Sequence, residues 1–207
     1  KDIKLAYLPS PGVVRLRLSG ISNSKAKIES LIQRELDKLN SIVKYDDNSK
    51  DLNQLVYDLC KIKCISISSA ESCTSGLIAS SLSQIPGSSN FFLGGIICYS
   101  DLSKINLLGI SPKLINEKSS VSEDVCFEMA QNVRNKFSSD YSIATTGYAG
   151  PTGGTEDNPV GTVFITINSL KGSITEKILF SGDRKIILNQ VRIKALELLI
   201  NEIKKHE

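Results

Sequence analysis

The chain has 207 residues, of which 41% are hydrophobic and 23% are charged, as in an ordinary globular protein. No apolar run approaches the ~20 residues of a membrane-spanning helix, and a signal peptide is not expected. The net charge of +3 is uneven. Residues 1–50 hold ten Lys/Arg against six Asp/Glu, and the remainder holds fifteen against sixteen. This basic density indicates a solvated surface rather than a nucleic-acid site.

The first fifty residues predict a small α+β unit. Two strands, at residues 3–8 and 13–19, flank a Pro-Gly turn, and apolar residues at helical spacing follow between Ile28 and Leu39. A further short strand is expected at residues 42–45, and the polar run at residues 46–50 indicates a linker.

Beyond the linker, helices and strands alternate, which predicts a mixed sheet with helices on both faces over residues 51–207. The chain is therefore expected to have the α/β fold class, preceded by the small α+β unit. The expected helices span residues 52–62, 75–84, 104–108, 123–137 and 185–205, and the expected strands span residues 64–68, 95–99, 141–145, 160–168 and 173–180.

The cysteines and the histidine restrict the possible chemistry. Five cysteines occur without CxxC spacing, which is typical of reduced thiols in a cytoplasmic protein. The only histidine, His206, is the penultimate residue, and no acidic residues cluster at ligand spacing, so no metal site is expected. Without a usable histidine, acyl-transfer chemistry would need Lys, Tyr, Asp or Glu as its base.

Four polar segments lie at junctions between the predicted strands, helices and loops, where open α/β sheets bind ligands. Each segment alone has an ordinary explanation. In chain order these are a Ser/Thr-rich helix cap, a Pro-Gly turn, a surface lysine and a glycine-rich loop. The first and last also leave backbone N–H groups free for an anion or an oxyanion. The segments are SAESCTSG (69–76), IPGSS (85–89), CYSDLSK (98–104) and TTGYAGPTGG (145–154).

Together these segments resemble the C-terminal domain of the CinA family, which also stands alone as the bacterial nicotinamide-nucleotide amidohydrolase (PncC-like). The matching stretches occur in family order: AESCTSG, PGSSNFFLGGIICYSDLSK, LLGI, VSEDVCFEMA, TTGYAGPTGGTEDNPVGTV and FSGDR. The sequence departs from the family pattern at Ser75-Gly76, where two glycines are common, and at Asp101-Leu102-Ser103, where a more polar run is usual. Neither departure removes a reactive group.

Residues 1–50, with KLAYLPSPGVVRLRL, are similar to the KH-type linking domain of longer CinA proteins. They contain no GxxG, so a spacer or dimerisation role is expected rather than RNA binding. In that family a molybdopterin-binding-like domain precedes the linking domain, so the chain is expected to be the back half of a longer protein.

The resemblance implies hydrolysis of nicotinamide mononucleotide to nicotinic acid mononucleotide and ammonia, with neither cofactor nor metal. In this interpretation Ser89 is the nucleophile, and Lys104 with Tyr99 is its base and proton relay. A lysine serves as base only where burial or a neighbouring cation disfavours its charged form. The implied substrate-binding residues are Ser72, Thr74, Thr146, Gly147 and Arg184, the last because a guanidinium group binds oxyanions in a bidentate manner.

Some assignments remain open. The oxyanion donors lie either in the Thr146–Gly150 loop or in the Ser72–Gly76 turn, and Cys73, beside a helix start, is an alternative nucleophile.

Two further hypotheses compete with the enzyme. One is a non-catalytic nucleotide-binding or assembly module of a longer CinA protein, and the other is nucleic-acid binding through the basic residues 1–50. The presence of Ser89, Tyr99, Lys104 and Arg184 favours the enzyme. The expected partners are a small-molecule nucleotide substrate and further copies of the chain in a homo-oligomer, with no membrane and no nucleic acid.

Overall fold

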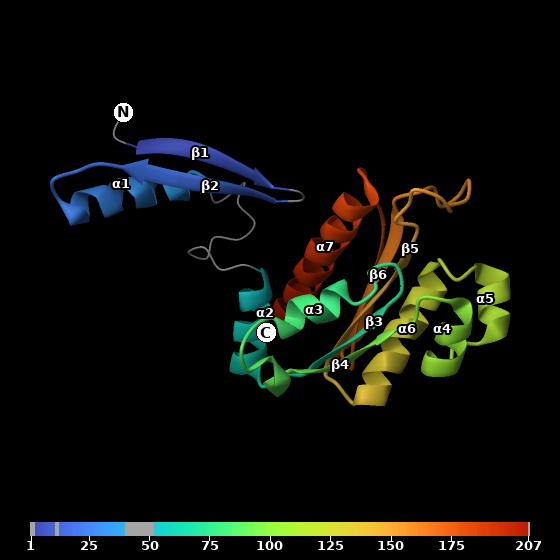
Figure 1. Ribbon diagram of the computed structural model, residues 1–207. Coiled ribbons are helices and arrows are strands. Elements are labelled where there is room, and N and C mark those ends of the chain that lie inside the picture. Colours follow the sequence, from blue (N-terminus) through green and yellow to red (C-terminus); the bar gives the residue numbers. More distant parts are fainter. Residues whose placement is uncertain (1–2, 11–12, 40–51, 207) are drawn as a thin grey trace. The chain divides into compact units, whose positions relative to one another are not determined.

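The computed structural model describes residues 3–10, 13–39 and 52–206 (Figure 1). The chain forms two compact units, Lys1–Lys50 and Asp51–Glu207. The strand expected at residues 42–45 and the linker expected at residues 46–50 lie outside the described residues.

The first unit is a hairpin with one helix. Strands β1 (Ile3–Ser10) and β2 (Val13–Gly20) pair antiparallel, and α1 (Lys25–Asp37) begins after Ser24, whose side chain accepts a hydrogen bond from the N–H of Lys27. None of the described residues of this unit is buried. Its identity as a KH-type domain stays a prediction.

The second unit contains a five-stranded sheet in the order β4-β3-β5-β6-β7. β3 pairs in parallel with both β4 and β5, whereas β6 pairs antiparallel with β5 and β7, so the expected mixed sheet is confirmed. The strands are β3 (Ile67–Glu71), β4 (Phe92–Ile97), β5 (Tyr141–Gly147), β6 (Thr162–Ser169) and β7 (Gly172–Leu179).

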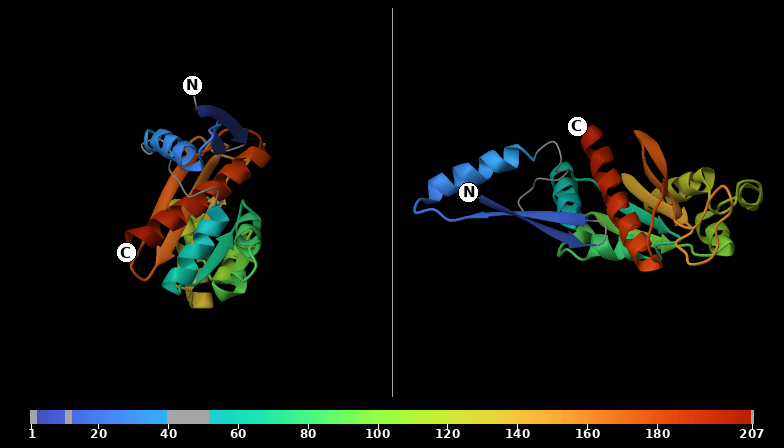
Figure 2. Two further views of the ribbon diagram at one scale, coloured as in Figure 1. Left: turned by 90° about the vertical axis from the view of Figure 1, so that its left-hand side faces the viewer. Right: turned by 90° about the horizontal axis from the view of Figure 1, so that it is seen from above.

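Helices cover both faces of this sheet, as expected (Figures 1 and 2). On one face lie α2 (Leu52–Lys63), α3 (Leu77–Ser83) and the long α7 (Arg184–Lys205). The other face is covered by α6 (Glu123–Phe137) together with α4 (Asp101–Leu108) and α5 (Pro112–Lys118).

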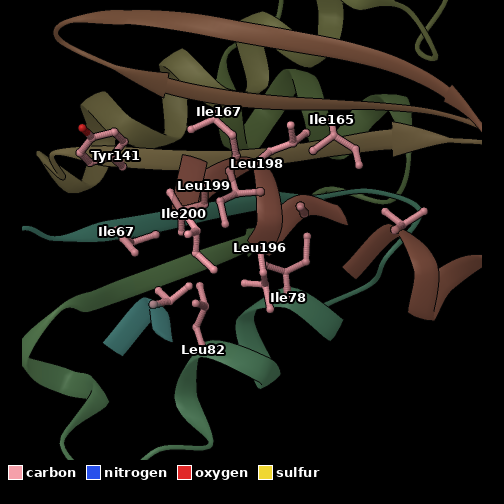
Figure 3. Packing of buried hydrophobic residues seen from close by; sticks show 14 of the residues in the cluster. Ile67, Ile78, Leu82, Tyr141, Ile165, Ile167, Leu196, Leu198, Leu199 and Ile200 are labelled. Carbon is pink, nitrogen blue, oxygen red and sulfur yellow. The ribbon is translucent and has the colours of Figure 1, made fainter. Parts of the chain in front are cut away.

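The larger apolar core lies between α7 and the sheet. Leu196, Leu199 and Ile200 of α7 pack in one buried cluster with Ile67 of β3 and Ile78 of α3 (Figure 3). Full burial of such side chains stabilises the fold by about 1.5–3 kcal/mol each. Ile187, in the first turn of α7, is buried in the same cluster, which holds this turn against the sheet.

Several elements differ from the sequence-based expectation. β4 and α4 each begin three residues earlier than expected, at Phe92 and Asp101. β3 begins at Ile67 rather than residue 64, because the left-handed residue Cys64 (φ 53°) ends the α2 turn and the strand continues through buried polar residues to Glu71. The helix α5 was not expected, although Pro112 suits its first turn.

Candidate active site

Three parallel strands end at one edge of the sheet. Glu71, the last residue of β3, pairs with Ile97 of β4 on one side and with Thr145 of β5 on the other. The segments that follow these strands therefore lie side by side, at the end of the parallel part of the sheet, where such sheets bind ligands. Three of the polar segments singled out in the sequence, 69–76, 98–104 and 145–154, begin here.

A small cavity of about 160 Å³ lies at this edge. Cys73, Asp101, Ser120 and Val121 contribute to its wall. Five residues predicted from the sequence also line it: Ser72, Tyr99, Lys104, Gly147 and Arg184.

Lys104 is the central charged group of the cavity. Its side chain is only 2% exposed, and its Nζ donates a hydrogen bond to Ser72 Oγ at 3.2 Å. The half-exposed carboxylate of Asp101 lies 3.8 Å from the same nitrogen. Burial of an amine is unfavourable unless it has polar partners, so these contacts account for its position. A hydroxyl and an amine thus meet in a confined space.

The first turn of α4 holds Lys104 in place. Ser100 caps this helix, because its Oγ accepts from the N–H of Ser103 at 3.1 Å and its own N–H donates to Ser103 Oγ at 3.0 Å. Such reciprocal capping fixes the start of a helix. Lys104 follows directly, one helical turn after the N-cap residue Ser100.

The turn that carries Ser72 is held by Glu71, which is 1% exposed. The Glu71 carboxylate accepts hydrogen bonds from the N–H groups of Gly76 (2.9 Å), Ile78 (3.1 Å) and Ala79 (2.7 Å) at the start of α3. A carboxylate at a helix N-terminus is stabilised by the helix dipole. Glu71 was not predicted from the sequence, although a glutamate just before a Ser/Thr-rich helix start was the available signal.

The same turn presents unused backbone donors. The N–H groups of Cys73 and Thr74 donate to no other residue in the part of the chain that the structure describes. They immediately follow Ser72. Free N–H groups in this position are suited to a developing negative charge on oxygen.

Arg184 lies at the cavity in the first turn of α7. Its guanidinium group donates to the carbonyl of Gly150 at 2.9 Å and to Tyr99 Oη at 3.2 Å. The carboxylate of Asp183, which precedes it, caps the helix by accepting from the N–H of Ile186. Arg184 therefore connects the end of β4 to the loop after β5 and places a positive charge at the cavity.

The two remaining predicted binding residues, Thr74 and Thr146, are close in sequence to the cavity-lining residues Ser72 and Gly147. Thr74 Oγ1 is 2.7 Å from Thr145 Oγ1, and Thr146 Oγ1 donates to the carbonyl of Ser120 at 2.8 Å. Both predicted threonines are buried, and their hydroxyls are used within the protein. Gly147 lines the cavity, and a Cβ there would lie 2.6 Å from the carbonyl oxygen of Thr162, so only glycine fits.

Ser89 is not brought to this cavity. It lies exposed in the short 3-10 helix η1 (Ser88–Asn90), which precedes β4, whereas Tyr99 and Lys104 follow that strand. The six residues of β4 span roughly 20 Å at 3.3 Å per residue. Within one chain, Ser89 and Lys104 therefore lie at opposite ends of β4.

Cys73 has the wrong ionisation state for a nucleophile. Burial raises the pKa of its thiol to about 12, so the thiol is protonated at neutral pH, and only the thiolate is strongly nucleophilic. Among the described residues, no three His, Cys, Asp or Glu side chains are grouped in a way that would hold a metal ion. The described helices also include none with the length and apolar character needed to cross a membrane.

The fold and this cavity define an α/β domain with a buried Ser–Lys contact at the ends of parallel strands. The chain belongs to the CinA family, since residues 49–203 match the CinA C-terminal domain. A CinA-like protein of Flavobacterium psychrophilum is 42% identical over 211 residues, covering 100% of this chain and 50% of that protein. Another, from Fervidobacterium nodosum, is 38% identical over 186 residues, covering 90% of this chain and 45% of that protein. The chain thus spans about half the length of these curated relatives.

Solved structures agree with this assignment. The competence damage-inducible protein A (ComA) from Klebsiella pneumoniae superimposes with a TM-score of 0.72 at 29% identity, covering 74% of this chain and 95% of that one. A competence-damaged protein (CinA) superfamily protein from Escherichia coli gives 0.70 at 31% identity, covering 78% and 95%.

Proposed function

We propose that the chain is an amidohydrolase that converts nicotinamide mononucleotide to nicotinic acid mononucleotide and ammonia. The observation that carries this proposal is the contact of Lys104 Nζ with Ser72 Oγ, in a cavity that also holds Arg184. A serine beside a lysine is the arrangement that acyl transfer needs in a chain whose only histidine, His206, lies at the far end of α7.

In this proposal Ser72, rather than Ser89, is the nucleophile. Lys104 in its uncharged form accepts the proton of the Ser72 hydroxyl while Oγ forms a bond to the carboxamide carbon. The C–N bond then breaks, and Lys104 returns the proton to the leaving ammonia. Water, deprotonated by the same amine, hydrolyses the resulting ester to release the acid and restore Ser72.

The remaining cavity residues contact different parts of the substrate. The N–H groups of Cys73 and Thr74 stabilise the oxyanion, which favours the Ser72–Gly76 turn over the loop after β5 for this role. Arg184, with Tyr99 beside it, binds the phosphate or ribose oxygens of the nucleotide. Binding energy from this remote group aids the chemistry at the ring amide.

For residues 1–50 we propose the linking role of longer CinA proteins, with the second unit acting as a cytoplasmic enzyme in pyridine-nucleotide salvage. The division of the chain at Lys50 supports a separate unit at this place. The length of the curated relatives supports a larger protein context.

The test is ammonia release by the purified chain from nicotinamide mononucleotide, with free nicotinamide as the matched substrate that lacks the phosphate and ribose. We expect release from the nucleotide, unaffected by EDTA, and a much lower kcat/KM for nicotinamide. Equal kcat/KM values would contradict the role of Arg184. Binding of the nucleotide without any ammonia release would instead identify a non-catalytic module.

A further inference from the structure

Asp101 brings a negative charge to the cavity at the strand ends. It lies in the first turn of α4, and among the described residues that line the cavity it is the only one with a carboxylate. Its side chain is 57% exposed, so the carboxylate lies where the cavity meets solvent. The Glu71 carboxylate, by contrast, is buried and accepts three N–H groups at the start of α3. Asp101 is therefore the carboxylate that an incoming ligand meets.

This carboxylate lies close to the serine of the cavity. Lys104 Nζ is 3.8 Å from Asp101 Oδ1 and 3.2 Å from Ser72 Oγ, so both oxygens contact the same nitrogen. The cavity measures only about 160 Å³. A ligand whose carboxamide carbon meets Ser72 Oγ therefore brings its ring into the neighbourhood of the Asp101 carboxylate.

The charges of the cavity favour a positive ring. In the proposed reaction Lys104 is uncharged when it accepts the serine proton, so it no longer balances the charge of Asp101. The guanidinium group of Arg184 is already bonded to the Gly150 carbonyl and to Tyr99 Oη. A nicotinamide ring that is linked to ribose carries a positive charge on its nitrogen, meta to the carboxamide. Such a ring supplies the cation that Asp101 lacks at this step.

An aromatic side chain adds to this attraction. Tyr99 lines the same cavity, and the face of an aromatic ring attracts a cation within about 6 Å of its centre. We infer that Asp101, with Tyr99, selects a ligand by the positive charge of its pyridinium ring. The chain binds a cationic pyridine carboxamide in preference to an uncharged aromatic amide of the same shape. This selection rests on the proposed function, since it concerns the ring of the proposed substrate.

The test compares two ligands that differ in the charge of the ring. One is nicotinamide mononucleotide, and the other is benzamide ribonucleotide, in which carbon replaces the ring nitrogen while the carboxamide, ribose and phosphate are kept. Binding is measured by calorimetry with the Ser72→Ala variant, which lacks the proposed nucleophile and so does not consume the ligand. We expect the cationic ligand to bind roughly tenfold more tightly. The factor is modest because Asp101 is half exposed and solvent screens its charge.

Asp101→Asn, in the same Ser72→Ala background, should remove this preference. The Kd of the cationic ligand should rise roughly tenfold, while that of the neutral ligand stays unchanged. The matched control is Asp124→Asn, since Asp124 lies in the first turn of α6, is 53% exposed and is 3.7 Å from Lys118, but is not among the cavity-lining residues. It should keep the full preference. If Asp101 only held Lys104 in place, its replacement would change both Kd values alike.

Salt provides a second measurement of the same effect. The preference for the cationic ligand should shrink as the ionic strength rises, because salt screens a partly exposed charge. Equal affinity for the two ligands, or a preference that survives Asp101→Asn, would overturn the inference.

The inference and the proposed function fail in different ways. A chain that prefers the cationic ligand but releases no ammonia sinks the proposed activity and leaves the selection by charge. An active enzyme that binds both ligands equally sinks the selection and leaves the activity. A chain that binds neither ligand contradicts both.

Discussion

Glu71→Gln should destabilise the second unit more than any surface carboxylate change. The carboxylate is buried and accepts three N–H groups at the start of α3. Glutamine keeps one acceptor oxygen but places an NH₂ group against at least one of these donors. The turn that carries Ser72 then loses part of its support, so activity should fall together with stability.

The magnitude follows from the geometry. Loss of one hydrogen bond to a charged group costs about 1.5–3 kcal/mol, and loss of a charge at a helix N-terminus costs about 0.3–2 kcal/mol. We expect a loss of about 3 kcal/mol in the free energy of unfolding. For a unit of this size that lowers Tm by roughly 6–12 °C.

The assay is denaturant unfolding followed by circular dichroism, with Glu176→Gln as the matched control. Glu176 forms a partly exposed ion pair with Lys194 at 2.8 Å, and such pairs contribute only about 0–1 kcal/mol. If Glu71→Gln unfolds at the same denaturant concentration as this control, the argument that Glu71 holds the turn is incorrect.

Three further predictions concern the cavity. Ser72→Ala and Lys104→Ala should each lower kcat by roughly 10²–10⁴-fold in steady-state assays. The double variant should be little slower than either single one, because the effects of removing two members of one catalytic unit are not additive. Strongly additive losses of kcat would contradict a joint role. Arg184→Ala should raise KM more than it lowers kcat, and a large fall in kcat at constant KM would reassign it to the transition state. Cys73→Ser should keep most of the activity, because a thiol with a pKa near 12 is almost wholly protonated at pH 7–8, below that pKa; an inactive, folded Cys73→Ser would overturn this.

Much of the fold was readable from the sequence because its elements are periodic and capped. The helix from residue 123 to residue 137 was expected with these bounds, and Ser122 caps it by accepting a hydrogen bond from the N–H of Val125. The position of β3 was harder to predict. Its buried residues include Ser68, Ser69 and Glu71, and these polar residues do not give the apolar pattern from which a buried strand is predicted. Hydrogen bonds between side chains allow them to be buried.

Prediction of the site was limited because a sequence motif does not show which segments lie close together in space. Lys104, Tyr99 and Ser72 meet because they follow parallel strands that end at one edge, a relation that the sequence motifs do not show. Arg184 reaches the same cavity from the first turn of α7. Ser89 belongs to the same sequence block as Lys104, yet β4 runs between them and separates them. Two residues on either side of a strand can therefore be near in sequence and far apart in space, since each residue of a strand adds about 3.3 Å to the distance between them.

The late position of α7 in the chain affects how the protein is made. At about 5–20 residues per second, the ribosome needs roughly 6–23 s to proceed from residue 67 to residue 184. During this interval Ile67 and Ile78 lack the helix that buries them in the finished fold. The nascent chain thus exposes an apolar sheet face, and such surfaces are prone to aggregation until they are covered. Arg184 is added at the end of the same interval, so the nascent chain acquires this cavity-lining cation only as the helix that closes the core begins to form.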